Sequence, residues 1–143
     1  MKLASYVVDG EEQFGVVRDD GVITMNHLFG ARAPSLRDAL AADMLAQIQE
    51  AARNASVDHK LSAIKFLPVI PNPDKIACAG INYRSHASET GREIPKQPSM
   101  FLRLANTLVG HEGEMIRPTV SQNFRFRGRT RGRDRSRRAS HPH

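Results

Sequence analysis

A histidine and a glutamate three residues apart are the side chains of this chain best suited to chemistry. The stretch that carries them follows a short apolar run that ends at Gly80. Asn82 can cap the start of a short helix, and Gly91 suits the left-handed position that ends one. On that helix His86 and Glu89 share a face, so the carboxylate can orient the imidazole and favour its protonated form. The pair has the composition of a general base that activates water.

The same spacing also occurs in surface ion pairs, which stabilise a helix by only about 0.2–0.5 kcal/mol. The position after a strand favours catalysis over this alternative, because catalytic residues often lie on the connections that follow strands. Lys75 and Arg103 could bind a substrate carboxylate or serve as surface charges, and both interpretations stay open. His27, His59 and His111 are scattered along the chain and are expected in loops.

Residues 1–25 predict a small antiparallel meander. β-prone residues reach Val8 and stop at Asp9-Gly10, and a second run occupies 14–17. Asp19-Asp20-Gly21 then precedes a third run at 22–24. Asp-Gly between β-prone runs is a hairpin signal, so three short strands are expected to pair in chain order.

A helix is predicted behind this meander. Ser35 is a good N-cap, and Asp38 stands in the first turn, where acidic residues are favoured. Apolar residues then recur at four-residue spacing, which indicates an amphipathic helix that ends near Asn54. They are Leu36, Leu40, Met44, Ile48 and Ala52.

A proline-rich segment separates this first unit from a second one. Pro68, Pro71 and Pro73 exclude a central strand there. We therefore expect a small N-terminal domain at 1–65, a second domain at 66–124 and a tail at 125–143.

The second unit is predicted to contain short strands. Lys75–Gly80 indicates a buried strand in which Cys78 is a small apolar side chain. Further strands are expected at 98–104 and, after a turn at 108–110, at 116–118. The fold class is therefore α+β and mainly β, with a meander and a helix followed by further strands.

Several separate motifs in this second unit occur in the order and spacing of one known family. They are Pro71–Ile76, Gly80–Gly91, Phe101–Arg103, Leu108–His111 and Ile116–Pro118. Over about residues 66–124 the chain resembles the fumarylacetoacetate hydrolase family. The resemblance implies the first part of that family's mixed β-fold, which is incomplete in this chain.

The resemblance also implies an activity. Members of this family hydrolyse, decarboxylate or isomerise β-diketo and 2-oxo acids with a divalent metal, expected to be Mg²⁺ or Mn²⁺. By resemblance His86 is the base and Glu89 its partner, and the intact parent binds a small oxo or diketo acid. Intact members commonly form homodimers, and this expectation is doubtful for a truncated chain.

The metal ligands implied by the resemblance are missing from this sequence. The family places a Glu-x-Glu pair shortly after the Ile-Arg-Pro segment, followed later by an aspartate. Glu112 and Glu114 have the right residue types, but they precede Ile116–Pro118. They are therefore expected to be exposed in a turn and not to hold a metal.

The basic character of the chain belongs to its tail. Residues 125–143 hold eight of the 21 basic residues and one of the 15 acidic residues, which leaves 13 basic and 14 acidic residues before them. Arginines alternate with other residues over 125–135, a pattern that suits contacts with phosphates. The alternative function is therefore binding to nucleic acid or another anionic surface. No recognised nucleic-acid-binding fold precedes the tail, so no specific nucleic acid is expected as a partner.

The tail also suggests a shifted reading frame. After Phe124 the family has a sequence close to Asp-Phe-Glu-Gly-Glu-Leu-Ala-Val-Val-Ile-Gly. If each arginine codon is CGN, reading from the second base of the Arg125 codon permits that whole series. We hypothesise a one-base frameshift just before Arg125, which places the two glutamates at Arg127 and Arg129. On this hypothesis the chain is truncated, has lost its metal ligands and is inactive.

The remaining features predict a soluble protein of a reducing compartment. The single cysteine excludes an intrachain disulfide. No apolar run resembles a signal peptide or a membrane span. We therefore expect a cytoplasmic protein with no membrane partner.

Overall fold

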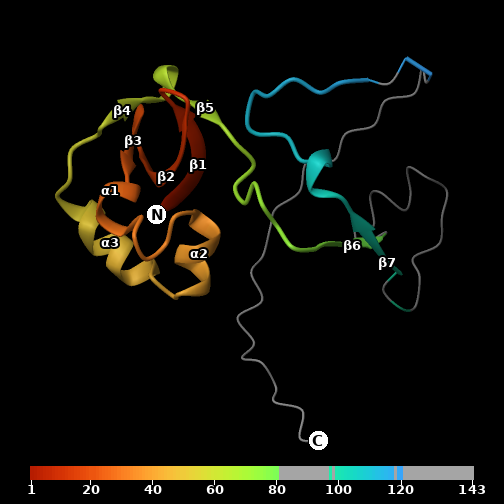
Figure 1. Ribbon diagram of the computed structural model, residues 1–143, viewed down its shortest axis with the longest axis horizontal. Coiled ribbons are helices and arrows are strands. Elements are labelled where there is room, and N and C mark those ends of the chain that lie inside the picture. Colours follow the sequence, from red (N-terminus) through yellow and green to blue (C-terminus); the bar gives the residue numbers. More distant parts are fainter. Residues whose placement is uncertain (81–96, 98, 118, 121–143) are drawn as a thin grey trace, which may run out of the picture.

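In the residues that the structure describes, the segment 67–75 joins two antiparallel sheets (Figure 1). The structure is a computed structural model, and it describes residues 1–80, 97, 99–117 and 119–120. The first sheet has five strands in the order β4-β3-β2-β1-β5, and the second pairs β6 with β7. The fold is thus mainly β, as the sequence predicts.

The predicted meander is confirmed. β1 (Lys2–Val8), β2 (Glu11–Arg18) and β3 (Gly21–Thr24) pair antiparallel in chain order. Asp9 and Gly10 both have positive φ, 51° and 83°, as a two-residue type I′ turn requires. The second turn differs from a simple Asp-Gly loop, because Gly21 is already the first residue of β3. A Cβ at Gly21 would lie 2.1 Å from Val57 Cγ1, so close packing is what requires glycine there.

Two further strands, which the sequence analysis did not predict, widen the sheet. β4 (His59–Lys60) pairs with β3, and β5 (Lys65–Phe66) pairs with β1 on the opposite edge. The short 3₁₀ helix η1 (Leu61–Ala63) connects them. β5 spans the position at which we predicted the domain boundary, and that boundary stays a prediction.

The predicted helix begins as expected but is broken in the middle. Ser35 and Asp38 form a complete capping box at the start of α2 (Leu36–Ala41). Asp43 then has φ 54°, and the helix resumes as α3 (Leu45–Arg53), with Asn54 at its C-cap. The amides of Asp43 and Met44 donate to the carbonyls of Leu40 and Ala39, which is a Schellman motif.

The break has a geometric reason. A four-residue spacing exceeds the 3.6-residue turn by about 40° at each step, so five such residues cannot stay on one face of a straight helix. Dividing the helix lets α2 and α3 both turn their apolar residues toward the sheet. Leu36, Met44, Ile48 and Ala52 are all buried in one cluster.

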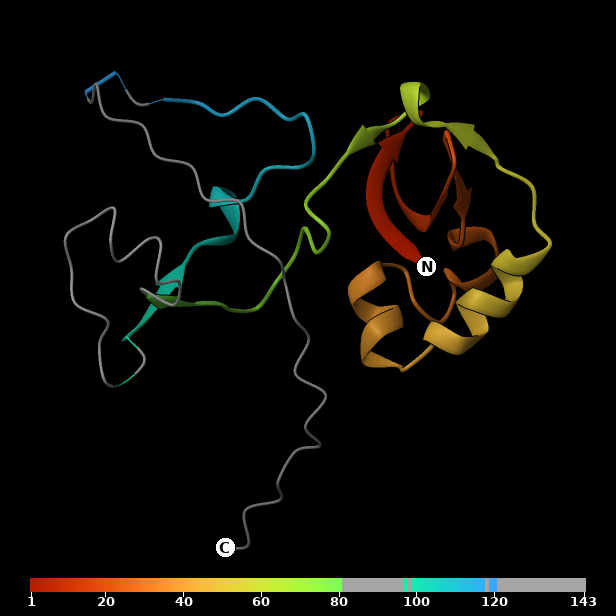
Figure 2. The ribbon, with the colours of Figure 1, turned by 180° about the vertical axis from the view of Figure 1, so that it is seen from behind.

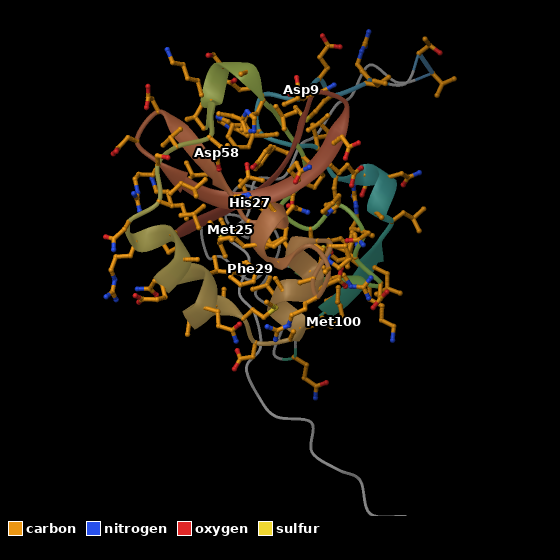
Figure 3. All side chains as sticks on the ribbon, turned by 60° about the vertical axis from the view of Figure 1, so that its left-hand side comes forward. Asp9, Met25, His27, Phe29, Asp58 and Met100 are labelled. Carbon is orange, nitrogen blue, oxygen red and sulfur yellow. The ribbon has the colours of Figure 1, made fainter. Side chains whose placement is uncertain are left out.

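The main core lies between the five-stranded sheet and the helices, which gather on one side of it (Figure 2). Phe14, Val16 and Ile23 point into it from the strands. Met25 is fully buried, and Phe29 of the short helix α1 (Asn26–Phe29) packs at its margin (Figure 3). His27 belongs to α1, and His59 to β4, so neither lies in a loop as predicted.

The second sheet forms where strands are predicted, but its strand β6 is less buried than predicted. β6 (Ile76–Gly80) and β7 (Ser99–Arg103) form where strands are expected, and they pair over five residues. The expectation that Cys78 is buried is wrong, because it is only half-buried in this two-stranded ladder. Within 104–117 the only regular element is the 3₁₀ helix η2 (Ala105–Thr107), so no strand begins at Ile116 in that described stretch.

Candidate functional site

The candidate catalytic segment begins where β6 ends. Gly80, the last residue of β6, pairs with Ser99 of β7. His86 and Glu89 follow within residues 81–96, which lie outside the described residues. The short helix that joins them therefore stays a prediction. The structure describes only the strand pair from which this segment continues.

The entry to β6 is attached to the first sheet. The Leu67 amide donates to the Ser5 carbonyl over 2.9 Å, and Ser5 Oγ donates to the Val69 carbonyl over 2.8 Å. Farther along, the Arg37 guanidinium donates to the Asn72 carbonyl over 3.1 Å and forms an ion pair with the Asp74 carboxylate. These contacts fix the proline-rich segment against β1 and α2 up to two residues before β6.

The chain after β7 is attached to the same sheet through β5. A Cβ at Gly110 would lie 2.1 Å from the Phe66 carbonyl oxygen, so only glycine allows this approach. The His111 ring meets the Phe66 ring edge-on, with centroids 5.5 Å apart and planes at 74°. The segment before β6 and the turn that follows β7 therefore both contact the N-terminal sheet.

A hollow of about 410 Å³ lies at this second attachment. It is lined by residues 61, 62 and 64–66 and by residues 111–113. Its volume falls in the range of small-molecule pockets, which is about 300–1,000 Å³. No sequence motif predicted it, because residues distant in sequence form its two sides.

Lys75 and Arg103, the candidates for binding a substrate carboxylate, are at the opposite end of the ladder from Gly80. Ile76 pairs with Arg103, and Lys75 immediately precedes that pair. At about 3.4 Å per residue, the strand separates Ile76 from Gly80 by roughly 14 Å. Both basic side chains are exposed, which fits the alternative interpretation that they are surface charges.

The acidic pair Glu112 and Glu114 is confirmed as a solvent-exposed turn. Glu112 has φ 57° in the turn after Gly110, and both side chains are exposed. In the part of the chain that the structure describes, no three His, Cys, Asp or Glu side chains come close enough to hold a metal ion. These donors therefore do not fit a divalent cation.

A series of hydrogen bonds between polar groups in the first sheet was not predicted. Tyr6 and Thr24 share a hydrogen bond of 2.9 Å between their hydroxyls, and the Thr24 amide donates to Asp58 Oδ2 over 2.7 Å. Burial raises the pKa of the Tyr6 phenol, the hydrogen bond from Thr24 opposes this, and the Asp58 charge adds to it. Tyr6 is fully buried, so these hydrogen bonds stabilise the fold, and the Tyr6 hydroxyl is not accessible to a substrate.

None of the helices that the structure describes is long and apolar enough to cross a lipid bilayer.

The comparisons with known proteins converge on one family. Residues 75–128 match the sequence model of the fumarylacetoacetate hydrolase C-terminal domain. That match begins one residue before β6 and continues four residues past Phe124. A human mitochondrial oxaloacetate tautomerase is 38% identical over 61 residues, and an uncharacterised Archaeoglobus fulgidus protein is 37% identical over 68 residues.

These relatives are much longer than the matched part. The alignments take in 43% and 48% of this chain but only 19% and 27% of the human and archaeal proteins. A solved structure described as an HpcE protein of Mycobacterium smegmatis has the same fold over 80% of this chain and 40% of its own, with a TM-score of 0.59 and 24% identity. The motifs from Pro71 to Pro118 and the match over 75–128 agree, so this part of the chain is similar to the C-terminal domain of the fumarylacetoacetate hydrolase family.

Proposed function

We propose that the domain beginning at β6 belongs to an enzyme of β-diketo or 2-oxo acids, which it hydrolyses, isomerises or decarboxylates. The family match over 75–128 carries this proposal, because it includes the segment with His86 and Glu89. The human relative is named an oxaloacetate tautomerase, which favours a small 2-oxo acid that exchanges between keto and enol forms.

His86 and Glu89 have defined roles in this proposal. The His86 imidazole accepts a proton from water or from the carbon next to the keto group. The Glu89 carboxylate orients the ring and stabilises the imidazolium that forms. The same pair serves hydrolysis and tautomerisation, because both begin with removal of a proton.

The residues that the structure describes offer no group of side chains that fits the divalent metal implied by the family. Glu112 and Glu114, which have the residue types of the family's Glu-x-Glu pair, are exposed in a turn. Arg127 and Arg129 stand where the resemblance places glutamates, and two cations repel a divalent ion. We therefore propose that this chain is inactive, and no catalytic step is assigned to a metal in it.

A one-base frameshift before Arg125 explains this mismatch. The family match continues to Gly128, so its last four residues, 125–128, already belong to the arginine-rich tail. Phe126 and Gly128 coincide with the phenylalanine and glycine of the expected series, and arginines stand at 125, 127 and 129, where that series has acidic residues. Sequencing the gene across the Phe124 codon tests the hypothesis. AGA or AGG codons for the arginines of 125–135 would contradict it.

Activity tests the proposed function directly. The 143-residue chain and a frame-restored chain are assayed with acylpyruvates and oxaloacetate in the presence of Mg²⁺. We expect turnover only in the frame-restored chain. Turnover by the 143-residue chain would show that the arginine-rich sequence does not remove activity, and no turnover by either chain would count against the substrate class.

A second candidate function rests on the alternation of arginines over 125–135. Arginine side chains bind phosphates, and such binding weakens steeply with salt. The test compares the whole chain with one ending at Phe124 for binding to single-stranded RNA at several salt concentrations. Binding that is unchanged by removal of the tail would exclude this function.

A further inference from the structure

The hollow between β5 and the turn at 110–113 combines half-buried apolar side chains with exposed charged ones. Its volume of about 410 Å³ is sufficient for a small molecule. Lys65 lines it from β5 and Glu112 lines it from the turn, and both residues are exposed. We call it the junction hollow, because it lies where the first sheet meets the chain that follows β7. The apolar residues of its lining, all half-buried, are Leu61, Ile64 and Phe66.

The opposite charges of the junction hollow do not neutralise each other. Among the residues that the structure describes, the Lys65 ammonium forms neither an ion pair nor a hydrogen bond. In the same part of the chain, the Glu112 carboxylate approaches one basic side chain, His111, with 3.9 Å between Oε1 and Nε2. That distance is too long for a hydrogen bond. The hollow therefore presents a base on one side and an acid on the other, and each can accept a further partner.

A backbone amide adds a polar group on the β5 side. The Leu67 amide donates to the Ser5 carbonyl, and the groups that face the partner strand alternate along an antiparallel pair. The amide and carbonyl of Phe66 therefore point away from β1, toward the side on which Gly110 approaches that carbonyl. Because β5 is an edge strand, this amide is open to an acceptor from outside the sheet. Together with the Lys65 ammonium, it can donate to a carboxylate.

A zwitterion matches this arrangement. Its carboxylate accepts hydrogen bonds from the Lys65 ammonium and the Phe66 amide, and its ammonium group pairs with the Glu112 carboxylate. A plain anion brings a second negative charge toward Glu112, and a plain cation brings a second positive charge toward Lys65. Neither of these ligands uses the charges on both sides of the junction hollow.

The apolar lining selects the rest of the ligand. Beside Leu61 and Ile64, an aliphatic side chain gains free energy in proportion to the apolar surface that it removes from water. We propose that the junction hollow binds a free α-amino acid with an aliphatic side chain, such as leucine. The inference goes beyond the proposed catalytic function and does not depend on it, because it involves neither His86 nor Glu89.

Titration of the isotope-labelled 143-residue chain with leucine tests the proposal. The Phe66 amide and the His111 ring protons report binding, since both residues line the junction hollow and their rings are in contact. We expect saturable shifts with leucine, and a downfield shift of the Phe66 amide as it gains an anionic acceptor. Isocaproate has the leucine skeleton without the ammonium group, and isoamylamine has it without the carboxylate. Both should bind more weakly than leucine.

Removing one charge at a time separates the two ends of the ligand. Lys65→Met should weaken leucine binding about two- to fivefold, since ion pairs open to solvent are individually weak. Glu112→Gln should weaken leucine binding to a similar extent but strengthen isocaproate binding, because the repelling carboxylate is gone. Lys60→Met and Glu114→Gln are the matched controls, because both residues are exposed and neither lines the junction hollow. They should bind leucine like the unaltered chain.

Folding is checked separately from binding. Lys65 and Glu112 are exposed and belong to neither buried cluster, so thermal unfolding of their variants should match that of the controls. Without ligand, unchanged signals of Phe66 and His111 show that the turn at 110–113 still contacts β5.

Three outcomes would overturn the proposal. The first is the absence of a saturable shift with leucine up to its solubility limit. The second is equal affinity for leucine in the Lys65→Met and Lys60→Met variants. The third is tighter binding of isocaproate than of leucine, which would make the junction hollow a site for simple anions.

Discussion

Arg37 on α2 holds Asp74, two residues before β6, by an ion pair between the guanidinium and the carboxylate. The same guanidinium donates to the Asn72 carbonyl over 3.1 Å. One side chain of the helical layer thereby fixes the segment just before residue 75, where the family match begins. Helix α2 thus supports the strand that leads to the candidate catalytic residues.

Replacing Arg37 tests this support. The ion pair is partly exposed, so Arg37→Ala should change the free energy of unfolding by less than about 1 kcal/mol. Its main effect should be faster amide hydrogen exchange in β6, because the segment 72–74 is released. Arg32→Ala is the control, since Arg32 is an exposed arginine just before α2. Equal exchange in the two variants would show that Arg37 does not position β6.

Gly110 is predicted to tolerate no side chain. A Cβ there would lie 2.1 Å from the Phe66 carbonyl oxygen, and backbone cannot move aside as a flexible side chain can. Gly110→Ala should therefore separate the turn at 110–113 from β5 and cost about 1–3 kcal/mol of overpacking. The chemical shifts of the His111 ring protons report the loss of the contact between the Phe66 and His111 rings. Gly113→Ala is the control, because its nearest contact is the movable Val109 side chain.

Tyr6 is predicted to make stability depend on alkaline pH. Burial raises the pKa of Tyr6 above its ordinary value of 10.0, so the folded state favours the neutral phenol. Its contribution is complete below the unfolded pKa, and it is lost as the pH rises from about 10 through the folded pKa. Urea unfolding between pH 8 and pH 11 should show this decline, and Tyr6→Phe should make it smaller.

The same Tyr6→Phe variant removes the hydrogen bond to the Thr24 hydroxyl. It should cost about 1 kcal/mol at neutral pH, the usual net contribution of such a bond. Absorbance titration of the phenolate in a Tyr83→Phe background follows Tyr6 alone, because the chain has two tyrosines. A Tyr6 transition at or below pH 10 would contradict the prediction.

His86 is predicted to carry the proton transfer of the proposed reaction. In the frame-restored chain, His86→Asn should lower kcat by about 10²–10⁴-fold, the usual contribution of a general base. Glu89→Gln should lower kcat less, because the imidazole remains but loses its orienting charge. His27→Asn is the control, since His27 lies on α1 in the first unit. A His86→Asn variant with unchanged kcat would remove His86 from the mechanism.

Local sequence patterns predicted the elements whose causes are local. The Asp9-Gly10 turn depends on two residues with positive φ, and the start of α2 depends on Ser35 and Asp38 three residues apart. The break at Asp43 was missed because its Schellman motif has an aspartate where glycine is usual. The extra strands β4 and β5 were missed because each has only two residues and pairs with a strand far away in sequence.

The sequence by itself indicated the family of residues 75–128 and predicted the candidate pair His86 and Glu89, because the order and spacing of the motifs are properties of the linear chain. It also determined the meander and the cap of α2, whose hydrogen bonds join near neighbours. Only the tertiary structure decided that Arg37 attaches the segment before β6 to α2 and that the turn at Gly110 contacts β5. It also decided that Met100 and Leu102 are exposed on one face while Phe14 is buried. Contacts and burial of this kind depend on which distant segments meet, and no local pattern specifies that.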